Sequence, residues 1–166
     1  MSDFVHQRHK PPQPLSAPRE LILVCAPLRS NVNFSRIVRA AGCCGIRKIV
    51  GCGHARIDKE IARIDSDQIE LEVHRTLLPV LKKLKELGHA LVGLEQTSNS
   101  ISLYEYRFNR RTALIVGNER TGLTEELLGA IDAVVEIPVY GLPFAHNVAT
   151  AAAIAMYEYC RQFPAG

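Results

Sequence analysis

Short apolar runs of strand length alternate along the chain with segments in which apolar residues recur at helical spacing. The run ELILVCA at residues 20–26 has the length and composition of a buried strand, whereas residues 34–44 place Phe34, Ile37 and Val38 on one face of a helix. This alternation predicts an α/β fold with a mostly parallel sheet and helices on both faces. The predicted strands span residues 20–26, 48–51, 90–94, 112–116 and 133–137, and the predicted helices span residues 34–44, 77–87, 124–129 and 147–162.

The two segments outside this pattern are the N-terminus and residues 52–76, for which no element is predicted. Residues 1–19 are polar and proline-rich, without an apolar segment of signal-peptide type. No run approaches the roughly 20 apolar residues of a membrane-spanning helix. With 166 residues in all, we expect a flexible basic tail over residues 1–19, a single domain over residues 20–166, and a cytoplasmic protein with no membrane partner.

Composition adds little to the choice of function. The formal net charge of +3 is only a weak sign of a nucleic-acid partner. The five cysteines are odd in number and include no CxxC pair, so neither a disulfide framework nor a metal site is predicted. We expect them to be small buried side chains.

Ligands of parallel sheets bind beyond the carboxyl ends of the strands, so the loops there are the places to search for chemistry. In the loop after the first strand, Asn33 is a natural helix N-cap and Arg39 lies less than two turns further on. An arginine there opposes the helix dipole, which a phosphate or ribose partner would explain. A capped helix with arginines on its solvated face is the alternative, and spacing alone favours it.

Two later loops are more distinctive. The loop GNERTGL at residues 117–123 has two glycines, Gly117 and Gly122, that let the backbone approach a ligand closely, but it matches no Walker or dinucleotide-binding pattern. The loop at residues 137–147 ends at Asn147, which caps an alanine-rich helix. That helix begins apolar nearly all round, which predicts burial on every side and suits a dimer interface.

Together these loops resemble the SpoU/TrmH family of RNA ribose 2′-O-methyltransferases, part of the SPOUT superfamily. The resemblance rests on Asn33 and Arg39, on GNERTGL, and on IPVYG followed by HNVATAAAIAMYE at residues 137–158. It implies a C-terminal trefoil knot, a homodimer and a bound S-adenosylmethionine (SAM). The SAM-binding positions that the resemblance implies, together with Gly122, are Leu94, Glu95, Gly117, Asn118, Glu119, Ile137, Val139, Gly141, His146 and Val148.

The resemblance also implies the catalytic positions Asn33, Arg39 and Asn147, with a more structural part for Glu119. In this hypothesis Arg39 stabilises charge on the ribose oxygen or holds a phosphate, and Asn33 orients the hydroxyl. The chain departs from the family pattern twice. Ser35 replaces a usual glycine, and Ala145 replaces a serine that is often placed near the substrate.

The implied substrate is tRNA or rRNA, because the acceptor 2′-hydroxyl is missing from DNA. Two alternatives stay open: a noncatalytic SAM- or RNA-binding dimer, which Ala145 favours, and a nucleotide hydrolase, for which Ser30, Ser35 and Thr121 show no nucleophile motif. The arginines that could contact phosphates, at even odds with solvated surface charges, are Arg29, Arg36, Arg110, Arg111 and Arg120.

Overall fold

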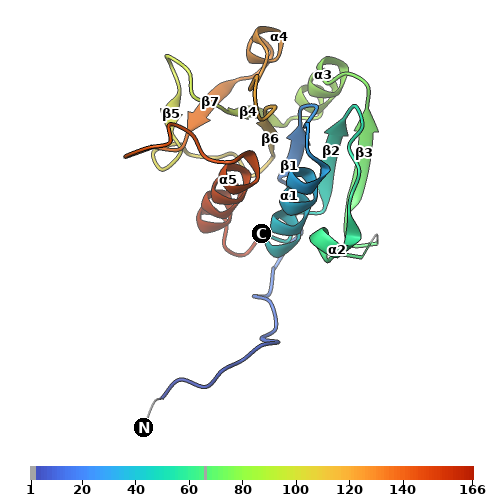
Figure 1. The fold of residues 1–166 in the computed structure, drawn as a ribbon, viewed down its shortest axis with the longest axis vertical. Helices are drawn as coiled ribbons and strands as arrows, with labels where there is room; N and C mark the ends of the chain where they lie inside the picture. Colours follow the sequence, from blue (N-terminus) through green and yellow to red (C-terminus); the bar gives the residue numbers. More distant parts are fainter. Residues whose placement is uncertain (1–2, 66) are drawn as a thin grey trace.

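The computed structural model describes residues 3–65 and 67–166, and within them seven strands form one parallel sheet (Figure 1). The order across the sheet is β3-β2-β1-β6-β4-β7-β5, and each paired neighbour runs in the same direction. The predicted parallel α/β fold is therefore confirmed. The strands are β1 Ile22–Cys25, β2 Lys48–Cys52, β3 Glu70–His74, β4 Ala90–Leu94, β5 Ile101–Ser102, β6 Thr112–Val116 and β7 Ala133–Glu136.

The two strands that the sequence pattern missed lie at the two edges of the sheet. Strand β3 falls in the segment for which no element was predicted, and its sequence ELEVH has charged residues where a central strand would be apolar. Strand β5 is only two residues long. Strand β3 needs little apolar surface, because an edge strand has a neighbouring strand on one side only. Strand β5 is too short to show any periodicity.

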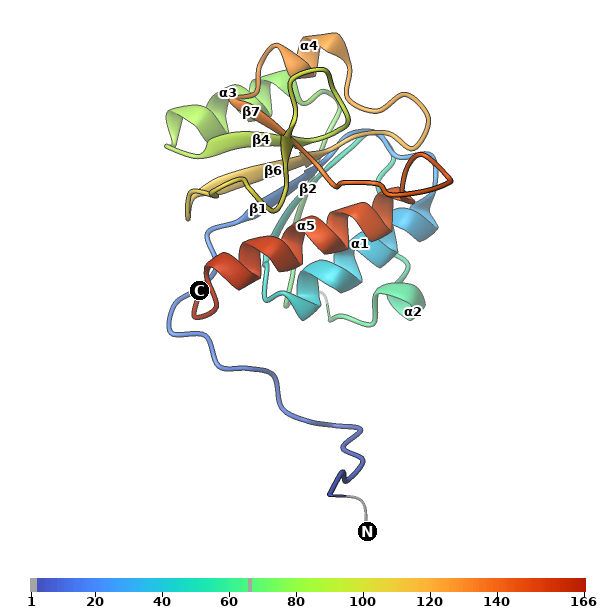
Figure 2. The same cartoon turned by 90° about the vertical axis from the view of Figure 1, so that its left-hand side faces the viewer.

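Helices cover both faces of the sheet, as predicted (Figure 2). Helices α1 and α5 pack together on one face with α2 beside α1, and α3 and α4 lie on the other. Along β1, Leu23 and Cys25 contribute to the core under α1 and α5, while Ile22 and Val24 contribute to the core under α3 and α4. The helices are α1 Asn31–Cys43, α2 Lys59–Ala62, α3 Leu78–Glu86, α4 Glu125–Leu128 and α5 Val148–Gln162.

The N-caps differ from expectation at one functionally important place. Thr124 and Asn147 cap α4 and α5 as predicted, with their side-chain oxygens accepting from Leu127 N and Ala149 N. The prediction that Asn33 caps α1 is wrong. Ser30 is the cap, and its hydroxyl accepts from Asn33 N at 3.2 Å. The side chain of Asn33 therefore does not cap the helix and is available for other contacts.

The prediction that α5 is buried on every side is also wrong for a single chain. One face of the helix, which includes Ala152, Met156 and Tyr159, is buried in the core. On the other face Tyr157 is 56% exposed. The expectation that the cysteines are buried fails in the same region, because Cys43 at the end of α1 is exposed.

The N-terminal segment extends away from the body of the fold and joins it before β1 (Figure 1). The backbone N–H of Ser16 donates to the carbonyl oxygen of Ala165 at 2.8 Å, and Arg19 donates to the carbonyl oxygens of Cys44 and Phe163. The division into a tail and a domain at residue 20 stays a prediction. Among the described helices, none has the length and apolar character needed to cross a membrane.

Candidate active site

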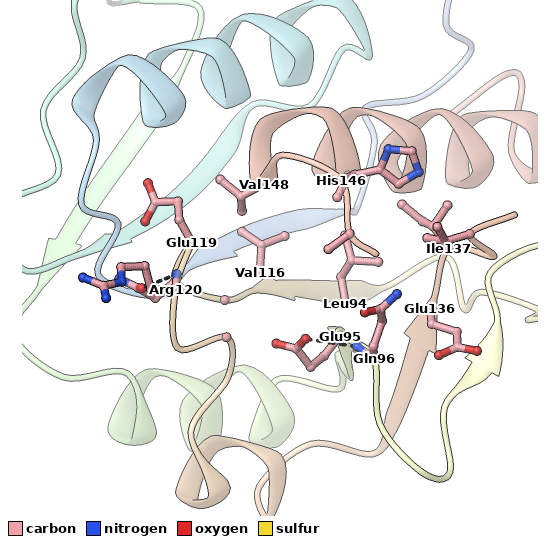
Figure 3. A pocket seen from close by; sticks show the side chains of 16 residues that line it. Leu94, Glu95, Gln96, Val116, Glu119, Arg120, Glu136, Ile137, His146 and Val148 are labelled. Carbon is pink, nitrogen blue, oxygen red and sulfur yellow. Dashed lines mark hydrogen bonds between the residues drawn. The ribbon is translucent and has the colours of Figure 1, made fainter. Parts of the chain in front are cut away.

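A pocket of about 280 Å³ opens at the carboxyl ends of three neighbouring strands (Figure 3). Leu94 ends β4, Val116 ends β6 and Glu136 ends β7, and all three line the cavity. The remaining walls come from the loops that follow these strands and from the start of α5. This is the edge of a parallel sheet at which ligands bind.

The pocket brings together ten of the eleven positions predicted to hold the cofactor. Gly141 is the exception, since it lines an adjoining hollow with Val139 and His146. The role of all eleven in cofactor binding stays a prediction. The ten that line the pocket are Leu94, Glu95, Gly117, Asn118, Glu119, Gly122, Ile137, Val139, His146 and Val148.

The loop at residues 117–123 is closed tightly on itself. Asn118 and Gly122 exchange two backbone hydrogen bonds of 3.1 and 3.0 Å, and the Asn118 side-chain oxygen accepts from Arg120 N at 2.8 Å. A Cβ on Gly117 would lie 2.5 Å from the carbonyl carbon of Gly122. Glu95 holds the end of the loop by accepting from Leu123 N at 2.9 Å. The loop therefore presents rigid backbone to the pocket.

We expect Gly122→Ala to weaken SAM binding by roughly ten-fold, because Gly122 has a φ of 65° and an added Cβ would lie 2.2 Å from Glu95 Oε2. The Glu95 carboxylate would have to leave Leu123 N. Calorimetry with SAM measures the effect. Gly129→Ala, at a position with ordinary helical φ, is the matched control. Equal affinity in the Gly122 variant and the wild type would show that the loop is not part of the binding surface.

A chain of hydrogen bonds links three separate segments beside the pocket. The Glu119 carboxylate accepts from Arg29 N at 2.8 Å and from the Asn33 side-chain amide at 3.1 Å. The Asn33 oxygen in turn accepts from the Asn147 side-chain amide at 3.3 Å. The loop after β6, the start of α1 and the start of α5 are thereby held in one arrangement.

The charge of Glu119 fits this position. Burial alone would raise the pKa of the Glu119 carboxyl, but hydrogen bonds from the backbone N–H groups of Arg29 and Ser30 and from the side chain of Asn33 together bring the pKa below its usual value. Glu119 is therefore an anion at neutral pH. The carboxylate of Glu119 ties the loop after β6 to the start of α1.

Arg39 lies apart from this cluster. Its side chain is exposed on α1, does not line the pocket and, within the described part of the chain, makes no hydrogen bond or ion pair. Ser35 has a structural contact, because it is buried and its hydroxyl accepts from Asp58 N at 2.8 Å, at the cap of α2. Ala145 lines the pocket, so the serine that it replaces would have faced the cavity.

The arginines predicted to contact RNA do not gather in one place. Arg120 lines the pocket, and Arg29 lies next to it through its bond to Glu119. Arg110 and Arg111 precede β6 and so lie at the opposite end of the sheet. The Arg110 guanidinium is 5.0 Å from the centre of the Phe163 ring, and Arg111 pairs with Glu20 at 3.5 Å. These two cannot act at the pocket of their own chain.

Four lining residues were absent from the sequence prediction altogether: Gln96, Val116, Glu136 and Ala151. Glu136 accepts from the Ser100 hydroxyl at 2.7 Å, and Gln96 donates to the carbonyl oxygen of Phe144 at 3.1 Å. The signal that could have identified the first three is their position, because each ends a central strand or follows one closely. Ala151 carries no such signal.

A family model described as the SpoU rRNA Methylase family matches residues 20–157. The chain belongs to this family. It is 28% identical over 133 residues to the tRNA (guanosine(18)-2′-O)-methyltransferase of Escherichia coli strain K12, which covers 78% of this chain and 58% of that protein. It is 27% identical over 148 residues to the Aquifex aeolicus enzyme of the same name, covering 87% and 70%. The chain thus spans less than two thirds of the Escherichia coli relative.

Solved structures of SpoU proteins have the same fold. The Aquifex aeolicus TrmH/SpoU tRNA modifying enzyme superposes with a TM-score of 0.82 at 27% identity, covering 88% of this chain and 76% of that one. The SpoU methyltransferase AviRb from Streptomyces viridochromogenes, in complex with AdoMet, gives 0.71 at 25% identity, with 92% and 61% covered. The resemblance inferred from the three loops is confirmed. The trefoil knot stays a prediction.

Proposed function

We propose that this SpoU family member transfers the methyl group of SAM to a ribose 2′-hydroxyl of tRNA. The observation that carries the proposal is the hydrogen-bonded chain Glu119–Asn33–Asn147, because it brings together three motifs that are far apart in the sequence. The relatives support the choice of substrate, since those from Escherichia coli and Aquifex aeolicus are named as tRNA 2′-O-methyltransferases. DNA lacks the acceptor hydroxyl.

The residues of the pocket suit SAM chemically. Leu94, Ile137 and Val139 supply apolar surface for an adenine ring, and the Glu95 and Glu136 carboxylates supply negative charge for the ammonium and sulfonium groups. The loop around Gly117 and Gly122 supplies backbone at close approach. When bound, SAM brings a methyl group already activated by its sulfonium.

The chain itself has to position the acceptor. Asn33 suits this task because Glu119 and Asn147 hold its side chain from both ends. A fixed side chain can orient a hydroxyl in line with the methyl group, and orientation alone accounts for a large part of many enzymatic rate enhancements. Asn147 supports Asn33 by donating its side-chain amide, and it caps α5 with its side-chain oxygen, which accepts from Ala149 N.

Arg39 acts on the RNA in this proposal and not on the cofactor. A guanidinium offers hydrogen-bond donors and no acceptor, so the proposal gives Arg39 no part in removing the proton. Arg39 can stabilise negative charge on the ribose oxygen or hold a neighbouring phosphate. The Arg39 side chain is exposed on α1 and away from the pocket walls. The substrate RNA therefore has to contact both the pocket and this part of α1.

We further propose a homodimer built on the exposed face of α1 and α5. Val32 on α1 is 43% exposed and Tyr157 on α5 is 56% exposed, while Cys43 is exposed at the end of α1. A second copy would cover this apolar surface and meet the expectation that α5 is buried all round. As a tRNA-modifying enzyme, the protein would act in the cytoplasm.

We expect SAM and S-adenosylhomocysteine to bind with a stoichiometry near one per chain in calorimetry, and ATP not to bind.

Unmodified tRNA transcripts incubated with tritiated SAM should then gain label that survives alkaline hydrolysis as a 2′-O-methylated dinucleotide. Sedimentation velocity should show that the protein is a dimer. SAM binding without transfer to tRNA or rRNA would favour the noncatalytic alternative. Absence of SAM binding both with and without RNA would refute the methyltransferase proposal.

A further inference from the structure

The loop between β7 and α5 carries the most exposed apolar side chains of residues 20–166. Tyr140 is 93% exposed, Phe144 79% and Leu142 77%, and after them the most exposed large apolar residue in the described part of these residues is Tyr157, at 56%. The loop projects beyond the N-terminal end of α5 (Figure 2). Apolar surface concentrated in this way beside a functional pocket marks a binding surface.

A hollow of about 260 Å³ lies against this loop and continues the SAM pocket. Val139, Ala145 and His146 line both cavities. The rest of the hollow has apolar walls, including Tyr140, and among the residues that the structure describes no Asp, Glu, Lys or Arg lines it. The hollow therefore suits a flat, uncharged group that is covalently joined to the part of a ligand that enters the neighbouring SAM pocket.

Phosphate-binding charge is available on the same side of the molecule. Arg120 lines the SAM pocket and is exposed, and Arg29 is exposed beside Glu119. The loop itself is loosely held. Among the described residues, one hydrogen bond involves residues 137–146, and it runs from the Gln96 side chain to the carbonyl oxygen of Phe144. A segment with so few contacts can adjust to a ligand.

We propose that the hollow, with the ring of Tyr140 in its wall, binds the unpaired nucleobase of the nucleotide that is methylated. The inference rests on the proposed function. A ribose placed at the methyl group carries its base into the next cavity, and single-stranded bases are held by stacking on aromatic side chains. Arg29 and Arg120 then lie where the flanking phosphates can be bound. The loop thereby selects an extruded nucleotide over one stacked in a helix.

The test compares ring-removing and ring-retaining variants. Tyr140→Leu should raise the KM for unmodified tRNA transcripts by roughly ten-fold, the loss of one stacking contact. Tyr140→Phe keeps the ring and should recover most of the wild-type KM. The affinity for SAM, measured by calorimetry, should change little in both. Tyr104→Leu is the control, because Tyr104 is 54% exposed and lines no described pocket.

A second readout, independent of turnover, separates this inference from the proposed function. It is the anisotropy of a labelled tRNA transcript titrated with protein and S-adenosylhomocysteine. Weaker binding by Tyr140→Leu without methyl transfer by the wild type would support the base site and refute the methyltransferase. Active wild type with an unchanged KM in Tyr140→Leu would overturn the base site alone. Dissociation of the dimer by Tyr140→Leu would overturn it too, since the loop would then be a subunit contact.

Discussion

Arg39→Ala is expected to lower the rate of methyl transfer by roughly a hundred- to a thousand-fold, the usual cost of removing one donor that stabilises developing charge. The fold should not change, because the Arg39 side chain is exposed and makes no hydrogen bond or ion pair in the described part of the chain. SAM affinity should not change either, since Arg39 does not line the pocket. Single-turnover transfer at saturating SAM and tRNA measures the rate.

Arg47→Ala is the matched control for this experiment. Arg47 is also exposed, but it precedes β2 and lies at the end of the sheet opposite the pocket. Melting temperature and SAM affinity should match the wild type in both variants, and only Arg39→Ala should be slow. Full turnover by Arg39→Ala with bound tRNA would show that Arg39 neither stabilises charge on the ribose oxygen nor holds a phosphate.

The central fold could be predicted because its signal is local. Strands β1 and β6 are buried along their whole length, and a strand that is buried on both faces has to be apolar at every position. The edge strands β3 and β5 escape this rule. The order of the strands is not local, because β1 pairs with β6 across slightly more than ninety residues.

Most of the residues that line the pocket could be picked out from the sequence, but their contacts could not. Glycines and strand ends pointed to the loop around Gly117, but nothing in the sequence shows that Glu119 reaches back to Asn33. The helix start illustrates the limit. Ser30 and Asn33 are both residue types that favour the N-cap position. Glu119 accepts a hydrogen bond from the Asn33 side chain, and Ser30 is the residue that caps α1. Tertiary contact decides between two locally equivalent choices.

Glu119→Ala tests that contact and should reduce kcat/KM by about a hundred-fold, because hydrogen bonds to a charged group are among the stronger ones and several are lost together. Arg29 N, Ser30 N and the Asn33 amide would all lose their acceptor. Unlike Arg39→Ala, this change should also weaken SAM binding, since Glu119 lines the pocket. Glu126→Ala, an exposed glutamate in the first turn of α4, is the control.

The dependence of stability on pH provides a second check on Glu119. Its pKa in the folded chain is lower than the usual 4.5, so the stability that it contributes is complete above that value and is lost as the pH falls through the lower folded pKa. In Glu119→Ala this part of the acid loss should be missing, so the difference in melting temperature from the wild type should shrink at acid pH. A constant difference from pH 3 to pH 7 would mean that the carboxylate charge is not what holds α1 to the loop. Asn33 would then have to be fixed by Asn147 alone, and Glu119→Gln would turn over as fast as the wild type.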